Sequence, residues 1–216
     1  MRKLSSGELG RPTAEQALET AKMPVTVVLD NVRSLNNVGS FFRTCDAFAV
    51  RRLVLCGITG TPPDREIHKT ALGAELTVEW SYCAKTEEAV AGLRDEGCTV
   101  LAVEQVEGAA TLGEFVPFGT GARVTASAEI EAGGNGETEA LAAEVKTEAG
   151  GSGAKYALVF GNEVEGVAQN VVDMCDGAIE IPQAGAKHSL NVAVSGGVVL
   201  WHFFAEYLRL SKMVVT

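Results

Sequence analysis

The sequence predicts an α/β fold with a mostly parallel sheet and helices on both faces of that sheet. Two observations support this prediction. Short apolar segments of strand length alternate with amphipathic segments of about ten residues, a pattern typical of β-α-β units around a buried sheet. The chain has 216 residues, which suits one domain of this class and is enough to bury a sizeable core.

The first half of the domain shows the clearest alternation. Residues 24–30 are apolar and rich in valine, as expected of a buried strand. A helix capped by Asn36 or Asn37 and ending near Ala49 follows, because its apolar side chains fall on one face. We further expect strands at 52–56, 76–80 and 98–103, and helices at 64–72 and 86–95.

The pattern decays between residues 107 and 154. Residues 127–155 hold six Glu against two Lys, and glycine-rich runs interrupt them. We interpret the acidic segment near 127–154 as a flexible insertion and not as a domain. Order returns with strands expected at 156–160 and 178–181 and a long apolar helix at about 190–210.

These elements suggest how the chain is divided. Thr13 stands three residues before Gln16, the spacing of a helix capping box. We therefore expect an N-terminal helical extension at 1–23 and one α/β domain at 24–216, which includes the insertion.

Composition argues against several classes of protein. No apolar run approaches the ~20 residues that span a bilayer, and a polar stretch follows Arg2 and Lys3, so we expect a cytoplasmic protein without membrane or secretory segments. The five cysteines and three histidines lack the spacing of a disulfide framework or metal site, so we expect no metal. The net charge of −10 argues against indiscriminate RNA binding, although its concentration in 127–155 leaves room for a local basic site.

Three polar loops follow expected strands, at the sheet edge where open α/β folds bind ligands. The first leads into the helix that holds Asn37 and Arg43. These residues lie about 240° apart around a helix, so both can border a cleft without sharing a face. An N-cap and a structural ion pair remain an equally good interpretation.

The second loop, 160–166, follows the strand at 156–160. Gly161 permits a ligand to approach the backbone closely, and Glu163 lies at the apex. The loop lacks the fingerprint of a dinucleotide-binding loop or a P-loop. The alternative interpretation is an ordinary strand-to-helix turn without a ligand.

The third loop, 181–191, continues into small and β-branched residues at 192–197, against which another segment or a ligand can pack. His188 and Ser189 are adjacent within it. Neighbouring side chains at a helix start point apart, and no nucleophile elbow is present, which argues against a hydrolase pair.

Together these loops resemble the three motifs of the SpoU-type (TrmH-like) RNA ribose 2′-O-methyltransferases of the SPOUT superfamily. The motifs are similar to residues 37–43, 160–166 and 181–192, where Gln183 replaces the usual methionine. The likeness covers about residues 24–210. It implies a Rossmann-like fold with a C-terminal deep trefoil knot, which composition and periodicity do not reveal.

The resemblance also implies an activity, methyl transfer from S-adenosylmethionine to a ribose 2′-hydroxyl of RNA. In the resemblance, Arg43 corresponds to the residue that activates that hydroxyl. A guanidinium is not a base near neutral pH. The alternative role for Arg43 is therefore to stabilise the alkoxide or to orient an RNA phosphate. The residues expected to hold Arg43 and the ribose are Asn37, Glu163, Ser189 and Asn191. Backbone groups near four residues are expected at the cofactor: Val103, Gly161, Ile181 and Leu190.

The resemblance further implies a homodimer. The terminal helix around Trp201, Phe203, Phe204 and Leu208 either forms that interface or packs in the core. We favour transfer RNA slightly over ribosomal RNA, because no separate recognition domain is evident and the chain is acidic. Three alternatives remain: an RNA base methyltransferase of the same superfamily, an inactive RNA-binding relative, and a nucleotide-binding Rossmann enzyme.

Overall fold

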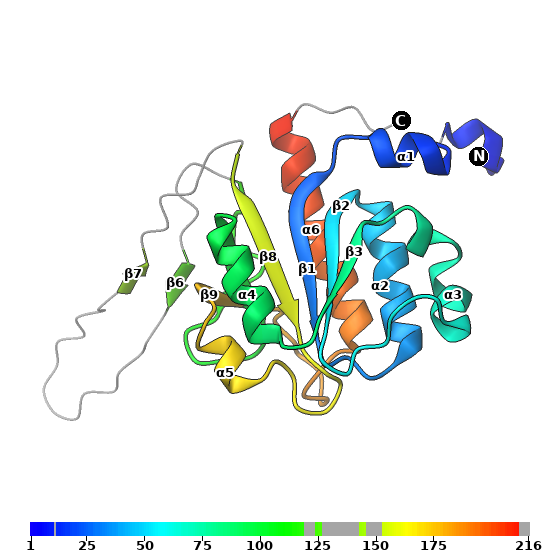
Figure 1. The fold of residues 1–216 in the computed structure, drawn as a ribbon. Coiled ribbons are helices and arrows are strands. Elements are labelled where there is room, and N and C mark those ends of the chain that lie inside the picture. Colours follow the sequence, from blue (N-terminus) through cyan, green and yellow to red (C-terminus); the bar gives the residue numbers. More distant parts are fainter. Residues whose placement is uncertain (11, 119–123, 127–142, 146–152, 212–216) are drawn as a thin grey trace, which may run out of the picture.

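The computed structural model describes residues 1–10, 12–118, 124–126, 143–145 and 153–211. A seven-stranded sheet in the order β3-β2-β1-β8-β4-β9-β5 lies at the centre, and all its paired strands run parallel (Figure 1). The prediction of a mostly parallel sheet is confirmed. The strands are β1 (Met23–Asp30), β2 (Val50–Cys56), β3 (Trp80–Cys83), β4 (Cys98–Val103), β5 (Ala110–Thr111), β8 (Lys155–Phe160) and β9 (Gly177–Glu180).

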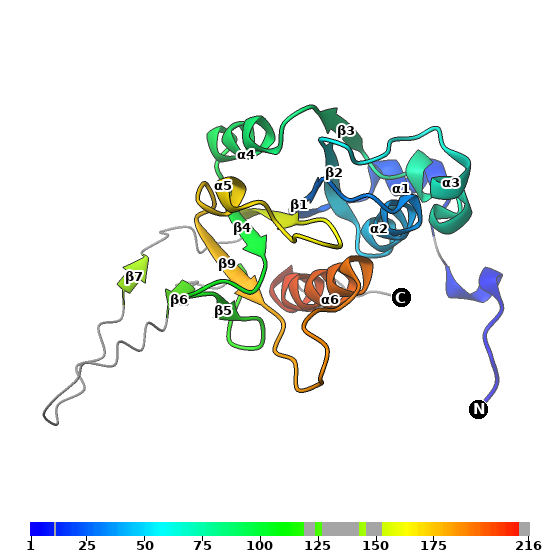
Figure 2. The ribbon, with the colours of Figure 1, turned by 90° about the horizontal axis from the view of Figure 1, so that it is seen from below.

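Helices cover both faces of the sheet, as the sequence predicts (Figure 2). On one face lie α2 (Leu35–Ala47) and α6 (Val192–Ser211), with α3 (Arg65–Ala71) beside α2, and on the other lie α4 (Thr86–Asp95) and α5 (Gln169–Val172). Side chains of β1 alternate between the faces: Leu29 packs on the α2 side and Val28 on the α4 side. Both faces are buried, which explains the continuous apolar strands in the sequence.

The remaining elements lie at the ends and edges of the sheet. η1 (Ser6–Leu9) and α1 (Ala14–Glu19) precede β1 at the edge opposite the strand carboxyl ends (Figure 1). α1 has the predicted capping box, in which Gln16 N donates to Thr13 Oγ1 (3.3 Å) and Thr13 N donates to Gln16 Oε1 (2.9 Å). β6 (Val124–Ala126) and β7 (Ala143–Val145) pair antiparallel, but most of the predicted insertion near 127–154 lies outside the described residues.

The expected elements at 86–95 and 98–103 match α4 and β4 to the residue, whereas the strand expected at 76–80 is wrong. Ala74–Leu76 form the 3₁₀ turn η2, and the strand begins only at Trp80, which pairs with Leu53 of β2. Gly73 precedes the turn in a left-handed conformation (φ 92°), which reverses the chain before it can join the sheet.

The cap of α2 also differs from the prediction. Ser34, not Asn36 or Asn37, caps the helix, because Ser34 Oγ accepts a hydrogen bond from Asn37 N (3.3 Å). The side chain of Asn37, the third residue of the helix, is therefore free for other partners.

The terminal helix packs its buried face into the core. Phe203 is fully buried among Phe115, Phe118 and Tyr156, with ring centroids 5.3–6.0 Å from its own. Trp201, by contrast, is 55% exposed. Phe203 is therefore a core residue. Trp201 is exposed and can contribute to the expected dimer interface. No helix in the described part of the chain is long and apolar enough to cross a membrane.

Candidate functional site

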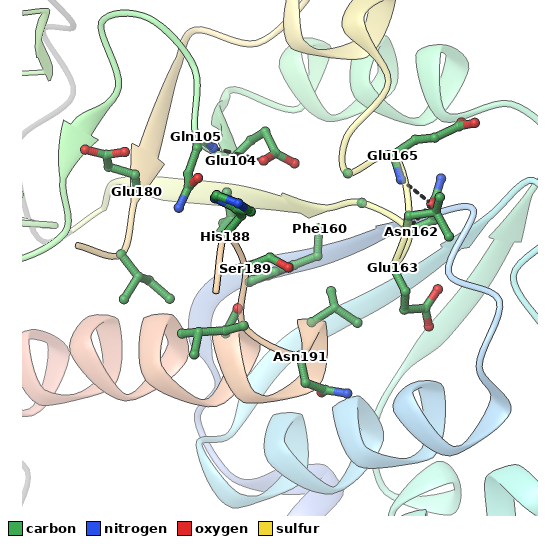
Figure 3. Close-up of a pocket in the computed structure, with 18 of the residues that line it drawn as sticks. Glu104, Gln105, Phe160, Asn162, Glu163, Glu165, Glu180, His188, Ser189 and Asn191 are labelled. Atoms are coloured by element: carbon green, nitrogen blue, oxygen red, sulfur yellow. Dashed lines mark hydrogen bonds between the residues drawn. The ribbon is translucent and has the colours of Figure 1, made fainter. Parts of the chain in front are cut away.

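A cavity of about 450 Å³ opens beyond the carboxyl ends of β4, β8 and β9 (Figure 3). Three segments form its wall: the residues after β4, the loop after β8, and the loop between β9 and α6. All four residues expected at the cofactor line the cavity: Val103, Gly161, Ile181 and Leu190. Three of the residues expected at the ribose line it too: Glu163, Ser189 and Asn191.

The loop after β8 folds back on itself. Asn162 and Gly166 exchange two backbone hydrogen bonds, each 3.1 Å long. A Cβ on Gly161 would overlap the backbone of Gly166 and Val167. The need for glycine at this position thus arises from the loop's own backbone, whereas the sequence suggested close approach of a ligand.

Glu163 connects this loop to the start of α2. Its carboxylate accepts hydrogen bonds from Arg33 N (3.1 Å), Ser34 N (3.1 Å) and Asn37 Nδ2 (2.8 Å). Partial burial opposes ionisation of the Glu163 carboxyl, but these hydrogen bonds outweigh it and lower the pKa below its ordinary value of 4.5. Glu163 is therefore an ionised structural link between two of the three motifs.

Asn37 extends this link to the third motif. Its Oδ1 accepts a hydrogen bond from Asn191 Nδ2 (3.2 Å). Asn191 in turn caps α6, because Asn191 Oδ1 accepts from Ala193 N (2.9 Å) and Val194 N (3.3 Å). A hydrogen-bonded chain from Glu163 through Asn37 to Asn191 thus joins segments that lie 126 and 154 residues apart in sequence.

Arg43 lies outside this group. It is exposed on α2 and does not line the cavity, and its side chain makes no hydrogen bond or ion pair with any residue the structure describes. Asn37 contacts Asn191 at the start of α6, and Arg43 lies about 240° further around α2, so the two side chains do not share one face of the helix. Asn37 does not line the cavity either, but it hydrogen-bonds to Glu163 and Asn191, which do.

Ser189 and His188 both line the cavity and are exposed, and neither hydrogen-bonds to the other. Gln183, the departure from the third motif, also lines it. Within the described residues no cluster of three His, Cys, Asp or Glu side chains could hold a metal ion.

Sequence reasoning missed the acidic character of the wall. Four carboxylates line the cavity, and no Lys or Arg of the described chain does: Glu104, Glu163, Glu165 and Glu180. Glu104 was detectable only by its position directly after the strand 98–103. A cavity with this charge favours a ligand that bears a positive group.

Comparison with known proteins agrees with the motifs. Residues 24–201 match the SpoU rRNA methylase family. The tRNA (guanosine(18)-2′-O)-methyltransferase of Thermus thermophilus is 28% identical over 202 residues, which cover 94% of this chain and 85% of that protein. The 23S rRNA (guanosine-2′-O-)-methyltransferase RlmB of Vibrio vulnificus is 24% identical, with 93% and 67% covered.

Solved structures share the fold. The A. aeolicus TrmH/SpoU tRNA modifying enzyme has a TM-score of 0.68 at 20% identity, with 92% of this chain and 82% of that chain covered. An AdoMet-bound rRNA methyltransferase from Sinorhizobium meliloti has a TM-score of 0.65 at 21% identity, with 92% and 61% covered.

Proposed function

Because the chain belongs to the SpoU rRNA methylase family, we propose that it transfers a methyl group from S-adenosylmethionine to a ribose 2′-hydroxyl of RNA. The main support is the hydrogen-bonded chain Glu163–Asn37–Asn191, which ties the first motif to the second and third motifs, and these two line one cavity. The named relatives methylate 2′-oxygens of guanosines in tRNA or 23S rRNA.

The cavity suits the proposed cofactor. Its volume of about 450 Å³ lies within the range of ordinary cofactor sites. Its carboxylates complement a cofactor that carries a sulfonium and an ammonium group. Backbone groups near Val103, Gly161, Ile181 and Leu190 would hold S-adenosylmethionine, which supplies an electrophilic methyl group when bound.

The protein then aligns the ribose hydroxyl with the methyl donor. The hydroxyl loses its proton as its oxygen accepts the methyl group. Asn37, Glu163 and Asn191 fix the two loops between which the ribose would lie, and Ser189 offers a hydroxyl from the cavity wall. Arg43 is the proposed activator of the hydroxyl. Because it is exposed, it reaches the reacting atoms only once RNA or a second copy of the chain has bound.

We also propose a homodimer. Val194, Val198 and Trp201 form an exposed apolar stripe along α6, with 53%, 40% and 55% of their surfaces exposed. Residues spaced by four and three lie on one helix face, as an interface between helices requires. Phe203 is excluded from this interface because it is buried in the core.

Finer parts of the proposal rest on the family resemblance, for the knot, and on sequence pattern and composition, for the others. We propose a trefoil knot near 181–191, a catalytic domain at 24–216 preceded by an extension at 1–23, transfer RNA as the preferred substrate, and the cytoplasm as the site of action. A crystal structure in which the chain path through 181–191 can be traced tests the knot. Parallel assays with transfer and ribosomal RNA test the substrate.

The activity is tested with labelled S-adenosylmethionine and bulk RNA. Base-resistant, ribose-methylated dinucleotides after digestion are expected. Methylated bases would indicate a base methyltransferase. Cofactor binding without methyl transfer would indicate an inactive relative, and tight binding of NAD would indicate a nucleotide-binding Rossmann enzyme.

The role of Arg43 is tested by Arg43→Ala. We expect turnover to fall by about 10²-fold or more, because the ribose hydroxyl loses its activator, while the affinity for S-adenosylmethionine stays unchanged. Normal turnover in this variant would refute the role.

A further inference from the structure

Glu104 lies where three neighbouring strands of the sheet end. It follows β4 directly, and its backbone N–H donates to Ile179 O of β9 (3.1 Å). Its carboxylate accepts two backbone hydrogen bonds, each 2.9 Å long. Gln105 N donates to Oε1 (Figure 3), and Val167 N donates to Oε2. The side chain lines the cavity and is half-buried.

The second of these bonds joins Glu104 to Val167, at the end of the loop after β8. Gly166 has a left-handed backbone (φ 71°), and a Cβ added to it would lie 2.9 Å from Glu104 Cδ and still closer to Oε2. The carboxylate therefore lies against the bare backbone of Gly166 and leaves no room for a side chain there.

The same loop is held from the other side by Glu163, which accepts from the start of α2, and at its end by Asp30, whose Oδ2 accepts from Ala168 N (3.1 Å). Three carboxylates from three segments thus determine the path of one loop. Of the three, Glu104 lies on the β4 side, beside Val103 and Gly161, the residues expected at the cofactor.

We propose that Glu104 is a positioning residue for the cofactor: it acts through the backbone of loop 161–167 and not by contact with the reacting atoms. The inference rests on the proposed cofactor site but concerns a residue outside the three motifs. If so, loss of the carboxylate weakens the binding of every ligand that fills the cavity, whether or not the sulfur of that ligand is charged.

Glutamine is the informative replacement. A carboxylate accepts both N–H groups, whereas an amide offers one oxygen and turns an NH₂ donor towards the other N–H. Glu104→Gln therefore keeps the size of the side chain but breaks one of the two bonds. Glu107→Gln is the matched control, because Glu107 is exposed three residues along the same segment and its carboxylate has no hydrogen-bond partner among the described residues.

The experiment measures binding of S-adenosylmethionine and S-adenosylhomocysteine to the full-length protein by calorimetry. For Glu104→Gln we expect both dissociation constants to rise by about tenfold, equivalent to about 1.4 kcal/mol. In turnover assays KM for S-adenosylmethionine should rise by a similar factor, while KM for RNA and kcat at saturating cofactor stay within about twofold of wild type. Glu107→Gln should match wild type throughout.

Three results would overturn the inference. Unchanged affinity in Glu104→Gln removes the positioning role. A loss confined to S-adenosylmethionine replaces it with a direct contact to the sulfonium charge. An equal loss of RNA affinity and of thermal stability indicates a general structural role. If wild type binds the cofactor but methylates no RNA, the proposed function fails, while the binding comparison still tests Glu104.

Discussion

Asn191 illustrates how single residues of this site serve two segments at once. Its side-chain oxygen caps α6, and its side-chain nitrogen donates to Asn37. Asparagine fits because it offers an acceptor and a donor on one short side chain. The two duties can be separated by substitution.

Asn191→Asp should keep the N-cap of α6 and lose the hydrogen bond to Asn37. Aspartate is as good an N-cap as asparagine, but its second oxygen would face Asn37 Oδ1, which is also an acceptor. We expect the free energy of unfolding to stay within about 1 kcal/mol of wild type and kcat to fall by about 10²-fold through misplacement of the loops. Urea denaturation and turnover assays measure the two effects. Asn191→Ala, the control, should lose both; full activity in Asn191→Asp would contradict the role of the link.

Glu163 predicts a dependence of stability on pH. Its pKa is lower in the folded protein than the ordinary value of 4.5, so its ionised form stabilises the fold above that pH. The contribution is lost as the pH falls through the folded pKa. Because the side chain is exposed, solvent screening limits the expected contribution to about 1 kcal/mol.

The measurement compares wild type with Glu163→Gln in urea at several pH values between about 3 and 7, on both sides of the ordinary pKa of 4.5. The advantage of wild type should be constant above pH 4.5 and shrink below it. Glu165→Gln is the control, because the Glu165 carboxylate has no hydrogen-bond partner in the described chain. A constant advantage down to the lowest pH would refute the prediction.

At the scale of elements, the site depends on how closely α6 approaches α2. A Cβ on Gly196 of α6 would lie 2.7 Å from Phe41 Cζ and nearer still to Cε1. Phe41 cannot move aside easily, because it is buried and packs on Phe160 with ring centroids 5.1 Å apart. The small residues that the sequence shows at 192–197 thus allow two helices to meet beside the cavity.

Gly196→Ala and Gly197→Ala should therefore have opposite effects. The first overpacks the interface between α2 and α6 and should lower the free energy of unfolding by about 1–3 kcal/mol. The second meets nothing within 4 Å, so the better helix propensity of alanine should raise stability by about 0.5–1 kcal/mol. Thermal and urea denaturation of the pair measure both. Equal effects of the two substitutions would show that the close contact is unimportant.

At the scale of the whole molecule, the sheet order determines which loops meet. β8 lies between β1 and β4, so its loop contacts the start of α2 on one side and Glu104 on the other. Periodicity predicts the elements well because each depends on local pattern, as at Thr86–Asp95. It cannot predict strand order, which depends on contacts between distant segments. The convergence of Asn37, Glu163 and Asn191 was therefore accessible only through family resemblance, and Glu104 was missed.

The proposed homodimer predicts that Trp201 lies in an interface between two copies of the chain. Trp201 belongs to the exposed stripe of α6, with its ring 5.9 Å from that of Phe48 and 6.3 Å from that of Phe204. A charge placed there would be desolvated without a partner in an interface, which is costly. Trp201→Glu should therefore convert a dimer into monomers and abolish turnover.

Sedimentation and light scattering measure the mass, and circular dichroism confirms that the variant is folded. Leu76→Glu is the matched control, because Leu76 is 74% exposed but lies on η2, away from α6. We expect it to remain dimeric and active, since a charge on a solvated surface costs little. Wild-type protein that sediments as a monomer would refute the homodimer, and Arg43 would then have to reach the ribose without a second copy of the chain. A Trp201→Glu variant that stays dimeric would place the interface elsewhere.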